Sequence, residues 1–94
     1  MRIIETTTQY RKDFELAKKR NLPIDKLNEI VIKLANDEPL PIINKDHQLR
    51  GYNPVIRECH ILPDWLLEYR KVDDGIIHLL KLIRTGTHSD LFKK

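Results

Sequence analysis

The sequence predicts an α+β fold in which a helical hairpin packs against one face of a small, mainly antiparallel sheet, in the order β-α-α-β-β-β. Two apolar stripes at helical spacing in the first part of the chain predict the hairpin, and three later segments rich in aliphatic and aromatic residues predict strands. A chain of 94 residues supports one hydrophobic core, so we expect a single domain spanning residues 1–94.

The first elements are a short strand and an amphipathic helix. Arg2–Thr6 has the composition of a strand, and Thr7 and Thr8 can cap a helix that begins near Gln9. The apolar positions at helical spacing are Tyr10, Phe14 and Ala17.

A second helix follows the break at residues 21–23 and ends before Pro39, because proline cannot continue the hydrogen-bonded ladder. Its stripe comprises Ile24, Leu27, Ile30, Val31 and Leu34. From Asp37 to about Pro54 the chain has three prolines, one glycine and no sustained period. Loops of this length in small domains are usually functional, and His47 lies within it.

Three consecutive antiparallel strands are predicted in the second half of the chain. They are Val55–Ile61, Trp65–Val72 and Ile76–Thr85. Leu62-Pro63-Asp64 and Asp73-Asp74-Gly75 separate them, and Asp74-Gly75 is a strong hairpin signal because glycine takes a positive φ without strain. Gly86 ends the last strand, and a short helical turn reaching Phe92 is expected after it.

The composition indicates a globular protein without a strong charge bias. Lys and Arg outnumber Asp and Glu by 17 to 14, a surplus too small for sequence-independent wrapping of a nucleic acid. No apolar run approaches the roughly 20 residues of a membrane-spanning helix, and the first residues lack a secretory pattern, so we expect a cytoplasmic protein. Cys59 is the only cysteine and is expected to pack as a small apolar group.

Three separated histidines and one aspartate have the chemistry needed to cleave RNA through its own 2′-hydroxyl. That reaction removes the hydroxyl proton, stabilises negative charge on phosphorus and delivers a proton to the departing 5′-oxygen. Histidine suits both proton steps near neutral pH. The candidates are His47, His60, Asp64 and His88. Neither a metal nor another cofactor is required.

Basic and aromatic residues are candidates for holding the substrate. Guanidinium groups are preferred where bidentate phosphate contact is available, and the candidates for the charge are Lys45, Arg50, Arg57, Arg70 and Arg84. Phe92 lies near the chain end with little core to reach, so it is expected to stack on a nucleobase. Trp65 is a candidate for the same role, although tryptophan is more often a core anchor.

Three sequence blocks carry a resemblance to a known family. They are Lys45-Asp46-His47-x-Leu49-x-Gly51, Arg57-x-x-His60-x-x-Pro63-Asp64-Trp65 and Arg84-Thr85-Gly86-Thr87-His88-x-x-Leu91-Phe92. In this order they resemble the YafQ-like branch of the RelE/ParE toxin superfamily. The resemblance implies a ribosome-dependent mRNA endonuclease that also contacts ribosomal RNA. It further implies a cognate DinJ-like antitoxin of the ribbon-helix-helix class, with operator DNA bound only through the toxin–antitoxin complex and no membrane partner.

The resemblance also implies roles for residues of this chain. His88 would be the general acid, while His47, His60 and Asp64 would share the base, orienting and charge-stabilising roles, with no single base assigned. Phe92 would position an mRNA base, and Trp65 would adjoin the site. The expected products carry a 2′,3′-cyclic phosphate and a 5′-hydroxyl.

Other classes of function remain open from the sequence. A toxin-fold protein could block translation or another target without cleavage, and the ParE branch attacks gyrase, although the three histidines argue against that target. Zinc binding through His47, His60 and His88 is a further alternative, but no short fixed ligand spacing supports it.

Overall fold

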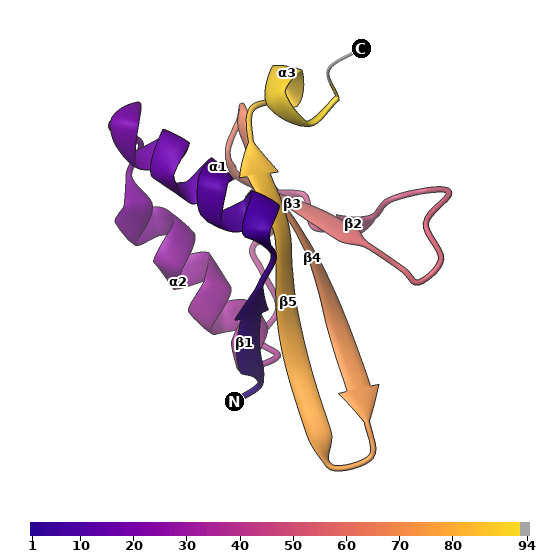
Figure 1. Ribbon diagram of the computed structural model, residues 1–94. Coiled ribbons are helices and arrows are strands. Elements are labelled where there is room, and N and C mark those ends of the chain that lie inside the picture. Colours follow the sequence, from indigo (N-terminus) through magenta and orange to yellow (C-terminus); the bar gives the residue numbers. More distant parts are fainter. Residues whose placement is uncertain (93–94) are drawn as a thin grey trace.

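Two helices cover one face of a five-stranded sheet in the computed structural model, which describes residues 1–92 (Figure 1). The strands are β1 (Ile3–Thr6), β2 (His47–Gln48), β3 (Arg57–Leu62), β4 (Trp65–Asp74) and β5 (Ile77–Gly86). The helices are α1 (Thr8–Lys19), α2 (Ile24–Ala35) and α3 (His88–Leu91), with a 3₁₀ turn, η1, at Ile42–Asn44. This arrangement confirms the predicted α+β fold and the helical turn after Gly86.

The strands lie in the order β1-β5-β4-β3-β2. β1 pairs in parallel with β5, and the other neighbours are antiparallel, so the sheet is mainly antiparallel as predicted. β2 differs from the prediction, because it is a two-residue strand inside the segment that was expected to be an irregular loop. Two residues are too few to show the alternating pattern that identifies a strand in a sequence.

A side-chain cap sets the start of α1, and a left-handed residue follows the end of α2. α1 begins at Thr8, one residue before the expected start, because the Thr7 hydroxyl accepts a hydrogen bond from the backbone N–H of Tyr10. α2 ends at Ala35, before Pro39 as predicted. Asp37 takes a φ of 56° there, and its backbone N–H donates to the Leu34 carbonyl, which closes the helix end.

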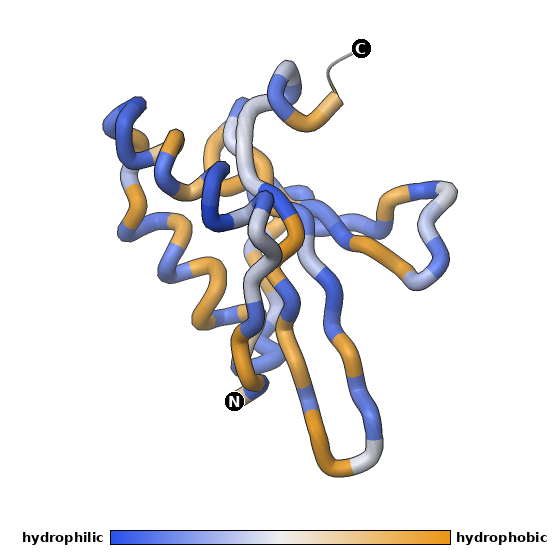
Figure 2. Tube along the Cα trace, viewed as in Figure 1, coloured by the Kyte–Doolittle hydropathy of each residue, from blue (hydrophilic) through white to orange (hydrophobic). Residues whose placement is uncertain are grey.

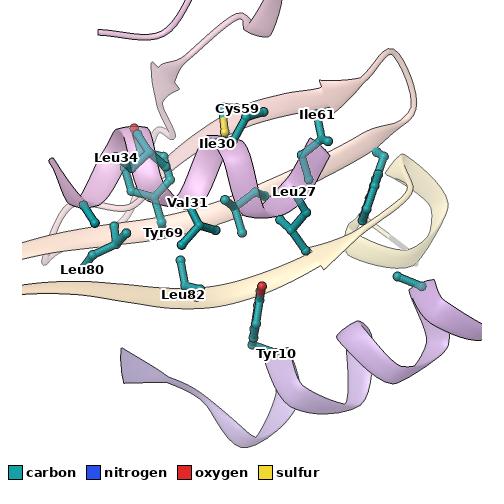
Figure 3. Close-up of a cluster of buried hydrophobic side chains, with 14 residues drawn as sticks. Tyr10, Leu27, Ile30, Val31, Leu34, Cys59, Ile61, Tyr69, Leu80 and Leu82 are labelled. Atoms are coloured by element: carbon teal, nitrogen blue, oxygen red, sulfur yellow. The ribbon is translucent and has the colours of Figure 1, made fainter. Parts of the chain in front are cut away.

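The hydrophobic core lies between the two helices and the sheet (Figure 3). It includes Tyr10 and Ala17 from α1, Leu27, Ile30, Val31 and Leu34 from α2, Cys59 and Ile61 from β3, Trp65, Leu67 and Tyr69 from β4, and Leu80 and Leu82 from β5. Cys59 is fully buried, and burial raises the pKa of its thiol to about 12, so it packs as an apolar group. The residues that alternate with these on β3 and β4 point to the face that the helices leave uncovered, called the distal face below.

A β-bulge in β5 sends neighbouring side chains to different faces of the sheet. Leu82 pairs with Tyr69, but Arg84 pairs with Glu68, so Ile83 is an extra residue without a partner on β4. Residues two apart on a regular strand share a face, and one inserted residue reverses this relation. Leu82 therefore joins the core while Arg84 shares the distal face with Glu68.

The β4–β5 hairpin turn lies one residue later than predicted. Asp74 pairs with Ile77, so the turn residues are Gly75 and Ile76 rather than the predicted Asp73-Asp74-Gly75. Gly75 has a φ of 61°, and glycine is favoured at the first central position of such a two-residue turn. The hairpin extends past the helices and carries an apolar tip (Figure 2), where Ile76 is 95% exposed.

Within residues 1–92, no helix has the length and apolar character needed to cross a membrane.

Replacing Gly75 with alanine should destabilise the fold through its backbone alone. A Cβ at this position would meet no atom within 4 Å, but a non-glycine residue at a φ of 61° is strained. We expect Gly75→Ala to lower the free energy of unfolding by about 1 kcal/mol in urea denaturation. Ile76→Ala, at the exposed neighbouring position, is the control and should change it little; equal stability of Gly75→Ala and the wild type would contradict the turn assignment.

Candidate active site

α3 holds His88 just beyond the end of β5. A capping box forms at its start, in which the Thr87 hydroxyl accepts from the Asp90 N–H at 3.1 Å and the Asp90 carboxylate accepts from the Thr87 N–H at 2.9 Å. Arg20, which follows α1, pairs with Asp90 at 2.7 Å and holds the pKa of that carboxyl well below its usual range. A Cβ on Gly86 would lie 2.9 Å from the Asp90 Cβ, so this approach requires glycine.

His88 is bound to Asp64 by two hydrogen bonds to the same oxygen. Asp64 Oδ1 lies 2.9 Å from the backbone nitrogen of His88 and 2.6 Å from its Nδ1. An ionised carboxylate only accepts, so Nδ1 carries a proton and donates it, while Nε2 points away from this contact. The bond from the His88 backbone N–H, followed by that from the side chain, lowers the pKa of Asp64, so the carboxylate persists into the acid range.

His60 and Phe92 lie on either side of His88. The His60 and His88 ring centroids are 5.6 Å apart in an edge-on arrangement, and those of His88 and Phe92 are 6.4 Å apart. His60 points to the distal face because its neighbours Cys59 and Ile61 face the core. The structure therefore brings together His60, Asp64, His88 and Phe92, from β3, the β3–β4 turn and the C-terminal segment.

His47 joins the same face through the short strand β2. It pairs with Glu58, which lies two residues before His60 on β3 and so shares its face. His47 Nδ1 lies 2.6 Å from the Lys45 carbonyl oxygen and therefore donates to it, while Nε2 lies 3.5 Å from Glu58 Oε1. Lys45 thus contributes its backbone to the placement of His47.

Glu58 belongs to a row of charged residues that crosses the sheet. The strand pairing places His47 beside Glu58, Glu58 beside Glu68, and Glu68 beside Arg84. Both glutamates are buried, and burial, followed by the charge of Glu58, raises the pKa of Glu68. Within the described chain, Glu58 Oε2 makes no hydrogen bond.

Glu58 is a residue of this face that sequence patterns alone do not single out. Its position two residues before His60 can be read from the sequence, but the strand register that joins it to His47 and Glu68 cannot.

Three residues that were predicted to contact the substrate lie away from the His60–His88 pair. Trp65 is 1% exposed and packs in the core, so the prediction that it contacts RNA is corrected: its side chain points to the helix-covered face of β4. Arg57 is also directed to that side, where it pairs with Asp46 and donates to the Tyr69 hydroxyl. Arg50 is exposed in the loop after β2, which projects away from the helices (Figure 1).

A hollow of about 280 Å³ adjoins His60 at the edge of β3. Its lining includes Lys26 from α2, together with Ile43 and Asn44 from the η1 turn. The Asn44 amide donates to the His60 carbonyl oxygen at 2.7 Å and so fixes this edge.

No group of three or more His, Cys, Asp or Glu side chains is arranged to hold a metal ion in the part of the chain that the structure describes. The three histidines singled out as an alternative zinc site are therefore not gathered as a ligand set. His47 is paired with Glu58, and His88 is paired with Asp64.

Comparisons with known proteins agree on one family. The family model for YafQ, a bacterial toxin of type II toxin-antitoxin systems, matches residues 2–93. The chain is similar to the mRNA interferase toxin YafQ of Escherichia coli K12, with 44% identity over 97% of this chain and 96% of the relative.

Two solved structures extend the likeness to the fold. The toxin in the crystal structure of the E. coli DinJ-YafQ toxin-antitoxin complex has a TM-score of 0.86 and 43% identity, covering 97% of both chains. A metal-bound toxin from Helicobacter pylori has a TM-score of 0.89 and 38% identity, covering 98% of this chain and all of that one (100%).

Replacing Glu68 with glutamine should stabilise the protein at neutral and alkaline pH. Its pKa is raised in the folded state, so the associated stability is present below the unfolded value and is lost as pH rises through the folded one. We expect Glu68→Gln to increase the free energy of unfolding by about 0.5–1 kcal/mol at pH 8 and to change it little at pH 4.

Urea denaturation at both pH values measures this effect. Glu29→Gln, on the exposed surface of α2, is the matched control and should show no such pH dependence. A larger gain for Glu68→Gln at pH 4 than at pH 8 would show that the Glu68 charge is not a cost to the fold.

Proposed function

Because this chain belongs to the YafQ family of bacterial type II toxins, we propose that it is an mRNA interferase, a ribosome-dependent endoribonuclease whose single toxin domain spans residues 1–94. It cleaves message by acid-base attack of the RNA 2′-hydroxyl and so inhibits translation. The observation that carries this proposal is the His88–Asp64 pair, with the His60 ring 5.6 Å from that of His88.

His88 acts as the general acid. Asp64 holds the proton on Nδ1 and turns Nε2 outward. In the imidazolium form Nε2 carries the proton that the departing 5′-oxygen requires. The second bond from Asp64, to the backbone N–H of His88, fixes the start of α3 so that the ring keeps this orientation.

We assign the base role to His60, whose ring lies 5.6 Å from that of His88. A scissile phosphate bound against both rings would have the acid on the side of the 5′-oxygen and His60 on the side of the 2′-hydroxyl, as displacement in line with the leaving group requires. His47 lies farther along the distal face, where its Nδ1 donates to the Lys45 carbonyl and its Nε2 faces Glu58. It serves as a second charged or basic group beside the substrate.

Arg84 and Lys45 supply positive charge for the phosphate chain. Gly86 and His60 both pair with Leu66 on β4. Arg84, two residues before Gly86, pairs with Glu68, two residues after Leu66, so Arg84 lies one cross-strand pair away from the level of His60. Phe92 is 48% exposed beside His88 and can stack on an mRNA base. Arg50, on the projecting loop, contacts more distant backbone or ribosomal RNA.

Two properties support dependence on the ribosome. The net charge of +3 provides little general attraction for RNA. His88 and Asp64 are both exposed, so the catalytic pair has no deep cleft that would hold a flexible strand by itself. The ribosome would present the message in the required geometry, and correct alignment of attacking oxygen and phosphorus contributes much of such a rate.

The partner that restrains this activity is a cognate antitoxin. Because the similar E. coli toxin forms a complex with DinJ, we infer a DinJ-like antitoxin of the ribbon-helix-helix class for this chain. An antitoxin segment that covers the distal face or displaces α3 would block His88 and Phe92. The complex would bind operator DNA through the antitoxin.

Neutralising Asp64 should loosen the hold on the His88 ring and slow cleavage. Asp64→Asn keeps an acceptor oxygen for His88, but a neutral amide binds the Nδ1 proton more weakly than a carboxylate and can turn its NH2 group toward the ring. We expect a loss of about tenfold in the cleavage rate. His88→Gln should lose about 100-fold or more at every pH, because the acid itself is absent.

Single-turnover cleavage of ribosome-bound message measures these rates. Asp74→Asn, on the distant hairpin, is the matched control and should retain the wild-type rate. A wild-type rate for Asp64→Asn would contradict the role of Asp64 in orienting His88.

The purified toxin should cut ribosome-bound message at least about 100-fold faster than the same naked RNA, because the ribosome aligns the reacting atoms. Primer extension on translated message locates the cut, and end analysis should find a 2′,3′-cyclic phosphate and a 5′-hydroxyl. DNA should stay intact, and a chelator should leave the rate unchanged.

Three outcomes would count against this proposal. Equal rates on naked RNA would refute ribosome dependence. Translation stalled on uncut message would favour a binding-only toxin, and loss of activity with the chelator would favour a metal-dependent reaction.

A further inference from the structure

We propose that Asp13 is a positioning residue for Arg84, orienting its guanidinium toward the phosphate of the bound message. This inference rests on the proposed RNA-cleaving function, in which Arg84 contacts the phosphate chain. Asp13 lies on α1, 71 residues away in sequence, and none of the sequence blocks of the site contains it.

Asp13 binds Arg84 through both of its carboxylate oxygens. Oδ2 accepts from Arg84 Nε at 3.1 Å, and Oδ1 accepts from Nη2 at 3.1 Å. Such a two-point contact fixes the plane of the guanidinium as well as its position. The Asp13 residue is 8% exposed, whereas the Arg84 side chain is 31% exposed, so a buried anchor holds a group that solvent and substrate can reach.

The carboxylate of Asp13 is itself fixed by two further contacts. Oδ2 accepts from the backbone N–H of Thr85 at 3.2 Å, and Oδ1 accepts from the Gln9 amide at 3.0 Å. The pairing of β1 with β5 ends at Thr6 and Leu82, so the edge of β5 beyond that point has no neighbouring strand. Asp13 occupies this edge and links α1 to the strand that carries Arg84.

The contact leaves the outer part of the guanidinium available. Nε and one N–H of Nη2 are used by Asp13, so Nη1 and the other N–H of Nη2 point away from the carboxylate. These two nitrogens form one edge of the guanidinium and suit bidentate contact with phosphate. Without Asp13, Arg84 would be free to turn toward Glu68, its cross-strand neighbour.

Orientation, rather than added charge, is the benefit of this pair. The Asp13 carboxylate offsets the positive charge of Arg84, so the ion pair attracts a phosphate less strongly at long range than free arginine would. An arginine is charged throughout the working range, and the Asp13 contact raises the pKa of Arg84 further. What Asp13 contributes is a fixed direction for the remaining donors.

A double-mutant cycle tests this role. We expect Asp13→Asn to lower the cleavage rate of ribosome-bound message by about tenfold, because a small displacement of a positioning group is costly. In an Arg84→Ala background the same substitution should have almost no further effect, since the group that it orients is absent. Glu15→Gln, which neutralises an exposed carboxylate on the same helix that pairs with Lys18 and not with Arg84, is the control and should retain the wild-type rate.

Arg84→Lys provides a second variant that leaves the Asp13 anchor of β5 intact. Lysine keeps the charge but cannot make the side-on contact, so we expect a loss similar to that of Asp13→Asn. Full activity of Arg84→Lys would overturn the proposal. An equal loss from Asp13→Asn with and without Arg84 would also overturn it, because that loss would reflect only the support of the Thr85 backbone.

A binding measurement tests this inference separately from the proposed reaction. The measurement is the affinity of the toxin for ribosomes that carry a message with a 2′-O-methyl group at the cleavage position, which cannot be cleaved there. We expect Asp13→Asn to weaken this binding severalfold, but not in the Arg84→Ala background. Additive losses in binding would refute the role of Asp13 whether or not the wild type cleaves message.

Discussion

The antiparallel pairing of β4 with β5 is the constraint on which the rest of the structure depends. Its regular part directs Leu80 and Leu82 into the core, and the bulge at Ile83 turns Arg84 to the distal face. The same register brings Gly86 opposite Leu66 and so sets where the chain leaves the sheet. A hydrophobic core and a charged surface are thus built from one strand, and a slip of one residue would exchange them.

The candidate active site follows from this register together with two short connections. The β3–β4 turn carries Asp64 to the end of the sheet where β5 stops, and α3 begins there with His88. The capping box and Arg20 hold α3, while Asp64 holds the His88 ring and backbone. Asp64 and His88 are therefore held by contacts between different elements, which is the kind of support that a precisely oriented site needs.

Much of the fold could be predicted from the sequence because periodicity reports which face of an element is buried. The two long helices were predicted in this way, and the three long strands were predicted from aliphatic and aromatic content between turn residues. Pairing between residues that are distant in the sequence produces no periodic pattern, so neither the bulge at Ile83 nor the two-residue β2 could be predicted. For the candidate site, residue type pointed to His60, Asp64 and His88, which the structure brings together. It gave no sign of Glu58, whose neighbours are set by strand register, or of Asp13, which reaches β5 through helix packing. It also did not show that Trp65 faces the core.

The central claim is that His60, Asp64 and His88 surround one scissile phosphodiester. A structure of the toxin on a ribosome with a message blocked by a 2′-O-methyl group at the cleavage position would test it most directly. The account predicts the phosphate between the His60 and His88 rings, His88 Nε2 directed at the 5′-oxygen, and Nδ1 still bound to Asp64. A message phosphate bound elsewhere, with no RNA between the two rings, would contradict it.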